Sequence, residues 1–343
     1  MRSSGWARAM AVVLALSILP IAVPDVAEPV AAAGESPFRV RQFDLRDLRA
    51  DQLPWTSEPP HPVPPKKPRD RIGVPLFRWR DGKLYYRPGA LAINGMKRID
   101  TYLETGNKRQ LKQALKQAER LRRMSLQRRR ANWLPFWFDY PEAAQRAPWF
   151  NAMSQGLALS FYVRLYEVTG KKFHLEAARK VFRSFDRFSR GGKKPWVSHV
   201  DSRRYLWLEH YPRAAPDHVL NAHIHAVIGL YEYWRATGSA RSERFLLGSI
   251  TTLKDNLRRF RRPGGLSIYG LRSRTRISKY HEVHIWQVKV VGQITGDPYF
   301  RKFAHRLARD RKPTGYIPGR PAAQLRDGVT AVARDGTRTF AKK

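Results

Sequence analysis

The chain has 343 residues, including 65 Lys or Arg and only 28 Asp or Glu, so its formal net charge at pH 7 is +37. It has no cysteine, which excludes disulfides, thiolate metal sites and a thiol nucleophile. A charge of this size attracts polyanions, and a hydrophobic content of 42% is enough to build a sizeable core.

Residues 1–33 have the pattern of an export signal. Arg2 and Arg8 form a positive start, an apolar run covers residues 10–23, and three alanines precede Gly34. The run is short for a membrane span, so we expect cleavage and then no span, with an uncleaved anchor as the alternative. The protein is expected to be secreted or associated with a bacterial cell envelope, which argues against a nucleic acid as the polyanion.

Three regions follow the signal. Residues 34–72 are rich in proline, which lacks an N–H and fixes φ, so this stretch predicts a linker. Residues 73–320 carry the periodic apolar pattern of a folded, catalytic domain. Residues 321–343 are polar and lack helical periodicity, which predicts a tail.

One sequence pattern recurs four times along the predicted domain. Four apolar helical patterns each end in Thr-Gly and are followed by a second helical pattern, at intervals of roughly 60 residues. A glycine just past a helix end is the usual left-handed cap. The four glycines predict four helical hairpins, and they are Gly106, Gly170, Gly238 and Gly296.

The two helices of each hairpin differ in character. Residues 157–168 and 219–234 are apolar around most of the circumference, which indicates helices buried on more than one side. Residues 172–188 and 244–260 are amphipathic and basic on one face. The chain is therefore predicted to be all-α: an α/α toroid, or incomplete α/α barrel, of about four hairpins, with long loops carrying short β segments at one end.

The connections that lead into the inner helices are long and aromatic. They cover residues 133–150, 198–216 and 264–284, and in a toroid all three converge at one end. Aromatic faces stack on sugar rings and Arg pairs with carboxylates, so a site for an acidic sugar is predicted there. The alternative for any one of these rings is a small core beneath a long loop.

Four motifs resemble the catalytic domain of the D-glucuronyl C5-epimerases. They are PWFNAMSQG (148–156), HYPRAAPDHVLNAHIHAVIGLYEY (210–233), IYGLR (268–272) and YHEVHIWQ (280–287). The resemblance runs from about Pro148 to Phe303, with a weaker match over 85–125. It implies an α/α barrel and action on heparosan or heparan sulfate precursors, without a cofactor.

The resemblance also implies a set of catalytic residues. The family's catalytic tyrosines fall on Tyr211, Tyr269 and Tyr280, and the arginine of its IYxLR motif falls on Arg272. The family has Glu-Glu-Tyr-Pro where this chain has Glu-His-Tyr-Pro, so its catalytic glutamate falls on His210, one place after Glu209. Either His210 takes that role, as the near-neutral titration of histidine permits, or the substrate or direction differs.

Epimerisation at C5 removes the proton next to a uronate carboxylate and returns one to the opposite face. Positive charge near the carboxylate stabilises the anion, and neighbouring cations would favour a phenolate base at Tyr269 or Tyr280. We therefore expect these two rings on opposite faces of the sugar. Substrate contacts are expected from Arg272, Glu209, Arg204, Asn221, His284, Trp149 and Gln155.

Two duller interpretations stay open. Tyr211 before Pro212 can be a loop anchor, and polar residues such as Asn221 on a buried helix can be satisfied core groups. His281 and His284 lie three apart, but without a clear third ligand no metal site is expected.

The sequence thus predicts an enzyme, a uronate 5-epimerase that converts D-glucuronate into L-iduronate, or related residues, within an acidic extracellular polysaccharide. A polysaccharide lyase, which removes the same proton and then expels the C4 substituent, is the close alternative. A non-catalytic acidic-glycan-binding protein is another. A glycoside hydrolase is disfavoured, because it normally needs a pair of carboxylates. Homodimerisation is left open.

Overall fold

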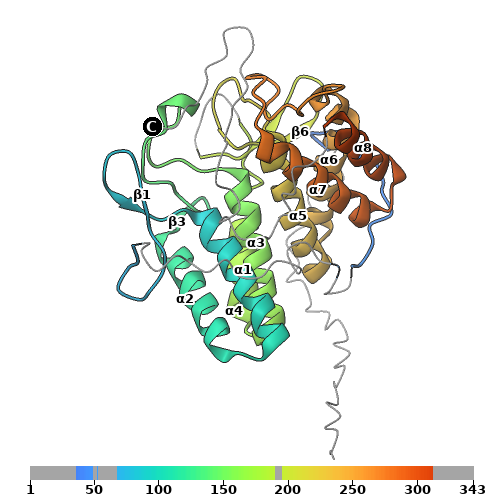
Figure 1. Cartoon of the computed structure of the whole chain (residues 1–343). Helices are drawn as coiled ribbons and strands as arrows, with labels where there is room; N and C mark the ends of the chain where they lie inside the picture. Colours follow the sequence, from blue (N-terminus) through green and yellow to red (C-terminus); the bar gives the residue numbers. More distant parts are fainter. Residues whose placement is uncertain (1–35, 49–51, 53–67, 190–194, 312–343) are drawn as a thin grey trace, which may run out of the picture. The chain divides into compact units, whose positions relative to one another are not determined.

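The computed structural model describes residues 36–48, 52, 68–189 and 195–311, and helices dominate them (Figure 1). The helices form four consecutive hairpins, which confirms the predicted all-α fold. The pairs are α1 (Pro88–Thr105) with α2 (Lys108–Met124), α3 (Ala152–Thr169) with α4 (Lys172–Phe182), α5 (Leu220–Thr237) with α6 (Ala240–Asn256), and α7 (Ser278–Thr295) with α8 (Pro298–Asp310).

The four predicted glycines end the first helix of each hairpin. Gly106, Gly170, Gly238 and Gly296 all adopt the left-handed conformation, with φ between 62° and 67°. Such a φ costs a residue with a side chain but is open to glycine. Local sequence therefore sets where each hairpin turns.

Short strands occur in the connections between hairpins. β1 (Phe77–Arg78) pairs with β2 (Leu84–Tyr85), β3 (Leu126–Arg128) with β4 (Ala131–Trp133), and β5 (Ser198–Val200) with β6 (Leu206–Leu208), all antiparallel. Two short 3-10 helices are η2 (Pro141–Ala143) and η3 (Leu257–Phe260). One strand pair precedes each of α1, α3 and α5, so the predicted β segments lie in the loops.

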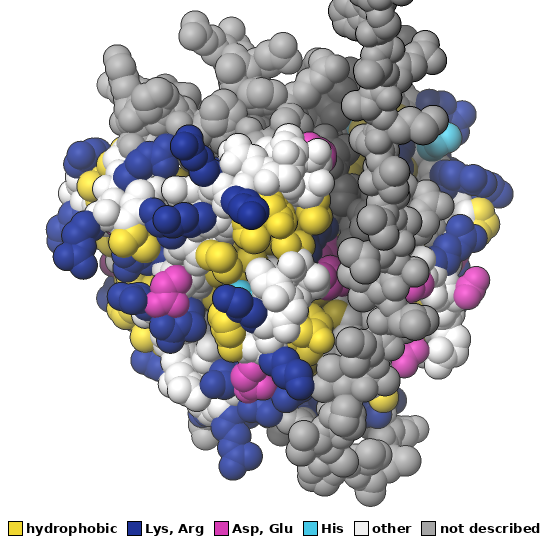
Figure 2. All heavy atoms as spheres, turned by 90° about the horizontal axis from the view of Figure 1, so that it is seen from below, with side chains coloured by type: hydrophobic (Ala, Val, Ile, Leu, Met, Phe, Trp, Pro, Cys, Tyr) yellow, Lys and Arg dark blue, Asp and Glu magenta, His cyan; other side chains and the backbone are white. Residues whose placement is uncertain are grey.

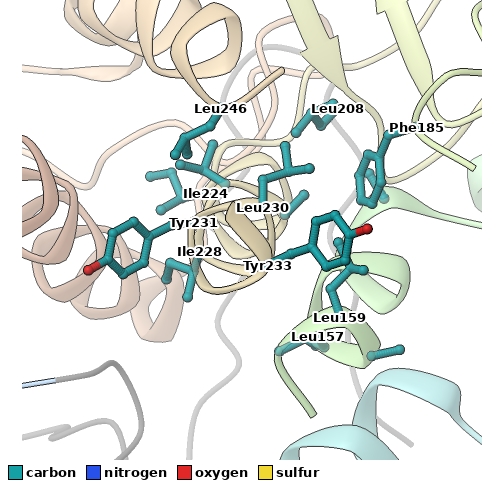
Figure 3. Packing of buried hydrophobic residues seen from close by; sticks show 14 of the residues in the cluster. Leu157, Leu159, Phe185, Leu208, Ile224, Ile228, Leu230, Tyr231, Tyr233 and Leu246 are labelled. Atoms are coloured by element: carbon teal, nitrogen blue, oxygen red, sulfur yellow. The ribbon is translucent and has the colours of Figure 1, made fainter. Parts of the chain in front are cut away.

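The first helices of the hairpins pack side by side in the order α1, α3, α5, α7, and each second helix packs on its own partner. This is the α/α-toroid arrangement. Figure 3 shows α5 at the centre of the core, with Tyr231 and Tyr233 pointing to opposite sides of the helix. The backbones of α3 and α5 lie very close together. A Cβ added to Gly229 would lie only 2.2 Å from the carbonyl oxygen of Gly156, so glycine permits this approach.

A buried charge network ties three inner helices together. The guanidinium of Arg164 on α3 donates to both carboxylate oxygens of Glu232 on α5, at 2.9 and 3.0 Å, and to Asp100 on α1 at 3.4 Å. The side chains of Arg164 and Glu232 are 4% and 0% exposed. Charges this deep are tolerated only when they are paired, so the network fixes the relative positions of α1, α3 and α5.

The predicted linker needs a correction over its first part. Residues 36–48, here called the N-terminal strap, lie against the domain. Phe38 is 2% exposed and contacts the Phe245 ring at 5.4 Å. The backbone of the strap bonds to α5 and α7, where Leu48 N–H donates to the Tyr231 hydroxyl and Arg46 N–H donates to a carbonyl of α7. Apolar residues such as Phe38 and Leu48 give this stretch a core contact that a linker lacks.

Other predicted regions lie outside the described residues: the signal at 1–33, most of the proline-rich stretch and the tail at 321–343. Among the described residues, no helix combines the length and apolar character needed to cross a bilayer.

Figure 2 shows Lys and Arg side chains spread over the drawn face, with few carboxylates between them. Such a face attracts polyanions, as the net charge of +37 predicts.

Candidate active site

Four tyrosines from three connections meet in one place. They form the tyrosine cluster, which consists of Tyr140, Tyr211, Tyr269 and Tyr280. The rings of Tyr269 and Tyr280 lie 4.7 Å apart, and those of Tyr140 and Tyr211 lie 5.9 Å apart. The hydroxyl of Tyr211 lies within hydrogen-bonding reach of the hydroxyls of Tyr269 and Tyr140. The predicted convergence of the connections is thus present.

The loop that carries Tyr269 is fastened to the start of α5. The N–H of Leu220 donates to the Tyr269 carbonyl at 2.9 Å, and the N–H of Ser273 donates to the Asp217 carboxylate at 2.6 Å. A Cβ on Gly270 would lie 2.2 Å from an Asp217 carboxylate oxygen, so any other residue here would have to displace this carboxylate. These contacts hold Tyr269 against Tyr280 in the first turn of α7.

Three phenols of the cluster are held in the protonated form. Burial raises the pKa of Tyr211, of Tyr280 and, most strongly, of Tyr269, where the neighbouring phenols raise it further. At Tyr280 the charge of Arg87 opposes the effect of burial without reversing it. The phenolate base expected among neighbouring cations is therefore not supported, since the raised pKa values of these hydroxyls favour the protonated form.

The contact between the Tyr269 and Tyr280 rings also corrects the predicted geometry. A sugar between two rings needs a centre-to-centre separation of roughly 7–8 Å, twice a van der Waals contact. At 4.7 Å no pyranose fits between them. Tyr269 and Tyr280 therefore form a single wall, and the opposite face of a sugar must meet another group.

His210 lies beside this wall. Its ring is 4.3 Å from that of Tyr211, and its Nδ1 atom is buried with no hydrogen-bond partner among the described residues. Burial lowers the pKa of His210 to about 3, and His225 and Arg87 contribute to the lowering. The imidazole is thus neutral above acid pH and can accept a proton. The near-neutral titration expected from the sequence is not found.

Helices α5 and α7 add further polar atoms. The Asn221 Oδ1, Gln287 Oε1 and His284 Nε2 atoms are buried and have no hydrogen-bond partner in the described part of the chain. The Gln287 amide donates to the Asn221 carbonyl at 2.9 Å and meets the His225 ring nitrogen at 2.8 Å. Buried polar atoms are usually paired, so this group has spare capacity for a polar ligand.

Three residues that were predicted to contact the substrate instead bond to or pack against other residues of the protein. Gln155 is fully buried and accepts from Leu134 N–H, while its amide donates to Asn132 and Ser184. The Glu209 carboxylate is fully buried and accepts from the His218 ring at 2.5 Å. The Trp149 ring stacks on Phe136 at 4.1 Å, and its indole N–H donates to a backbone carbonyl.

Of the two predicted arginines, Arg204 bonds through its side chain to another part of the chain, and Arg272 bonds through its backbone. Arg204 is exposed in a left-handed turn with φ of 64°, and its guanidinium donates to the Ser36 carbonyl of the N-terminal strap. Arg272 is exposed as well, and its backbone N–H points to the Asp217 carbonyl at 3.4 Å. Of the predicted residues, His210, Tyr211, Tyr269 and Tyr280 lie together. Asn221 and His284 each keep one buried polar atom without a partner in the described part of the chain.

Sequence reasoning missed Tyr140, Arg87 and Lys279. Tyr140 and Lys279 lie in the connections 133–150 and 264–284, in which other residues were selected as candidates. Arg87 directly precedes α1, and the rule that connections into inner helices converge applies equally to the first hairpin. Extending that rule to residues 84–87 would have found it.

The buried histidines predict acid lability. Burial lowers the pKa of His223 and His225 to about 4 and of His284 to about 3. The unfolded chain binds these protons near pH 6.5, so it takes up more protons than the folded chain at lower pH. Stability is therefore full above about pH 6.5 and falls toward pH 4, by up to about 1.4 kcal/mol for each histidine as the pH drops by one.

The measurement is the urea midpoint from about pH 7 to about pH 4.5. His223→Gln should flatten the fall, because its ring accepts from Leu208 N–H and bonds the Ser249 carbonyl in the neutral form. His305→Gln, at an exposed position on α8, serves as the matched control. A midpoint that does not change over this range would contradict the prediction.

The arrangement of the hairpins defines an α/α toroid. Cellobiose 2-epimerase from Bacillus thermoamylovorans has a TM-score of 0.53 at 13% identity, covering 75% of this chain and 70% of that one. A Listeria innocua protein has a TM-score of 0.50 at 12% identity, covering 68% and 63%. At such identities the likeness concerns the fold alone.

The sequence match is more specific. Residues 129–309, more than half of the chain, match the family described as D-glucuronyl C5-epimerase C-terminus, and the chain belongs to this family. A D-glucuronyl C5-epimerase from Caenorhabditis elegans is 27% identical over 179 residues. That alignment covers 46% of this chain and 28% of the worm protein, so the chain spans less than a third of that relative.

Proposed function

We propose that the protein is a uronate 5-epimerase, which inverts C5 of D-glucuronate or related residues within an acidic polysaccharide such as heparosan. The observation that carries the proposal is the meeting of Tyr211, Tyr269 and Tyr280 beside His210, at the positions of the family's catalytic motif residues. Membership of the family supports the reaction class.

In the proposed first step the neutral imidazole of His210 accepts the C5 proton. The C5–H bond breaks, an N–H bond forms, and the electron pair spreads onto the uronate carboxylate. Burial and the nearby Arg87 keep the imidazole unprotonated in the free enzyme, and the bound carboxylate would raise its basicity. His210 would thus take the part of the family's glutamate.

In the second step the Tyr280 hydroxyl returns a proton to the opposite face of C5. The O–H bond breaks, a new C–H bond forms, and the phenolate left behind lies near Lys279, whose Nζ is 5.1 Å from the ring centre. The imidazolium then gives its proton back to the phenolate, for which the hydroxyl of Tyr211 beside His210 offers a path. The enzyme is restored without a cofactor.

The place of action is part of the proposal. Residues 1–33 have the pattern of an export signal, and the net charge of +37 suits capture of a polyanionic glycan outside the cell. We propose a secreted or envelope-associated bacterial enzyme that acts on a uronate polymer. A homodimer remains a hypothesis that gel filtration would test.

Incubation with several uronate polymers in deuterated water tests the function. Loss of the H5 signal in NMR, with appearance of the inverted sugar, is the expected result. Growth of the ultraviolet absorbance of an unsaturated uronate would identify a lyase instead. Binding of the polymers without any deuterium at C5 would identify a glycan-binding protein.

A further inference from the structure

We infer that Arg87 and Lys279 together bind the carboxylate of the uronate at the reacting sugar. The inference rests on the function proposed above and names the part of the site that recognises the acid. Both residues differ from the arginine that the family motif suggested, and Arg87 lies outside the matched range of 129–309.

The position of Lys279 is defined by the tyrosine wall. It occupies the first turn of α7, and its ammonium lies 5.1 Å from the centre of the Tyr280 ring. The Tyr280 ring in turn contacts that of Tyr269 at 4.7 Å. A carboxylate bound by Lys279 would therefore bring the adjoining C5 atom to the hydroxyl groups of the cluster.

Arg87 approaches the same place from α1. Its guanidinium lies 4.8 Å from the Phe77 ring, and Phe77 belongs to the aromatic group that also contains Tyr140 and Tyr211. Its charge acts on Lys279 and Tyr280 at the start of α7 and on His210 before α5. Arg87 is thus a cation that acts on the tyrosine cluster and on His210 together.

The positive charges of Arg87 and Lys279 repel each other. Burial lowers the pKa of Lys279, and the charge of Arg87 lowers it further. Within the described part of the chain neither side chain has a carboxylate partner, whereas Arg80 is paired with Glu142 and Arg120 with Asp70. Both residues are exposed and the Tyr280 ring is half-buried, so an anion can reach the two unneutralised cations and be stabilised by both.

The geometry favours a uronate carboxylate as that anion. It must be small enough to reach a site between two side chains, and it must belong to the sugar whose C5 meets Tyr280. An Arg fork beside an ammonium matches the two oxygens of a carboxylate. Neutralising the carboxylate also stabilises the anion formed when C5 loses its proton, so the pair would lower the barrier as well as KM.

The test uses a short oligosaccharide with one uronate, so that the many surface cations matter little. Arg87→Gln and Lys279→Gln should each weaken its binding by about tenfold, and the double variant more. Arg87→Lys should recover part of the loss. The same oligosaccharide with its carboxylate reduced to an alcohol should bind all forms equally weakly.

Arg301→Gln, at an exposed position on α8, removes one charge away from the site and should leave binding unchanged. Thermal melting of each variant checks the fold, and Arg87→Lys keeps the charge if Arg87→Gln is unstable. Equal binding by the wild type and the double variant, or a loss confined to Arg272→Gln, would overturn the inference. Carboxylate-dependent binding without deuterium exchange would leave the inference standing and refute the epimerase.

Discussion

Tyr280→Phe is expected to lower the rate of inversion at C5 by at least about 100-fold, because the variant lacks the proton that the second step delivers to the opposite face. The ring, its contact with Tyr269 at 4.7 Å and its packing with Lys279 are kept in the variant. Binding of the uronate oligosaccharide should therefore change little. NMR of the inverted sugar gives this rate, whereas deuterium that enters C5 from the side of His210 leaves the configuration unchanged.

Tyr205→Phe is the matched control for this experiment. Tyr205 also carries a partly buried hydroxyl, which donates to Asp255 at 3.1 Å, but it belongs to the β5–β6 connection near the strap. Its loss should not alter inversion. If Tyr280→Phe formed the inverted sugar as fast as the wild type, Tyr280 would not be the proton donor, and the proposed second step would be wrong.

Arg164→Met is expected to destabilise the protein by about 3–5 kcal/mol, because it leaves buried carboxylates without their cation. Glu232 is fully buried and Asp100 nearly so, and neither can reach water without opening the packing of α1, α3 and α5. The free energy of unfolding in urea measures the effect.

Two further variants separate charge from packing. Arg179→Met removes a partly exposed partner of Glu176 and should cost less than about 1 kcal/mol. Adding Glu232→Gln to Arg164→Met removes one stranded charge and should restore part of the stability. If Arg164→Met were no worse than Arg179→Met, the network would not hold the inner helices in place.

The hairpins could be predicted because local chemistry determines them. A Thr-Gly after an apolar helix requires only a left-handed turn, and each of Gly106, Gly170, Gly238 and Gly296 adopts it. The meeting of Tyr211, Tyr269 and Tyr280 also followed, since the order of hairpins places their connections at one end. These inferences needed periodicity and topology but no side-chain direction.

The misassigned residues depend on side-chain direction. Glu209 and His210 are neighbours, yet one is buried against His218 and the other lies at the tyrosine cluster. Gln155 sits in a matching motif, but its amide donates to β4 and to a serine just after α4, across long sequence distances. Whether a phenol becomes acid or base likewise depends on burial, which raised the pKa of Tyr269 despite the basic sequence around it.

The N-terminal strap changes where the domain can safely be cut. Trimming at the sequence boundary of residue 73 would remove Phe38, which fills a notch over Gly248 and touches Phe188 and Phe245. It would also remove the Arg46 carbonyl, to which the Tyr231 hydroxyl donates a hydrogen bond at 2.8 Å. A shortened protein would thus expose an apolar surface and aggregate more readily on warming, although it would keep the sequence of every helix of the toroid.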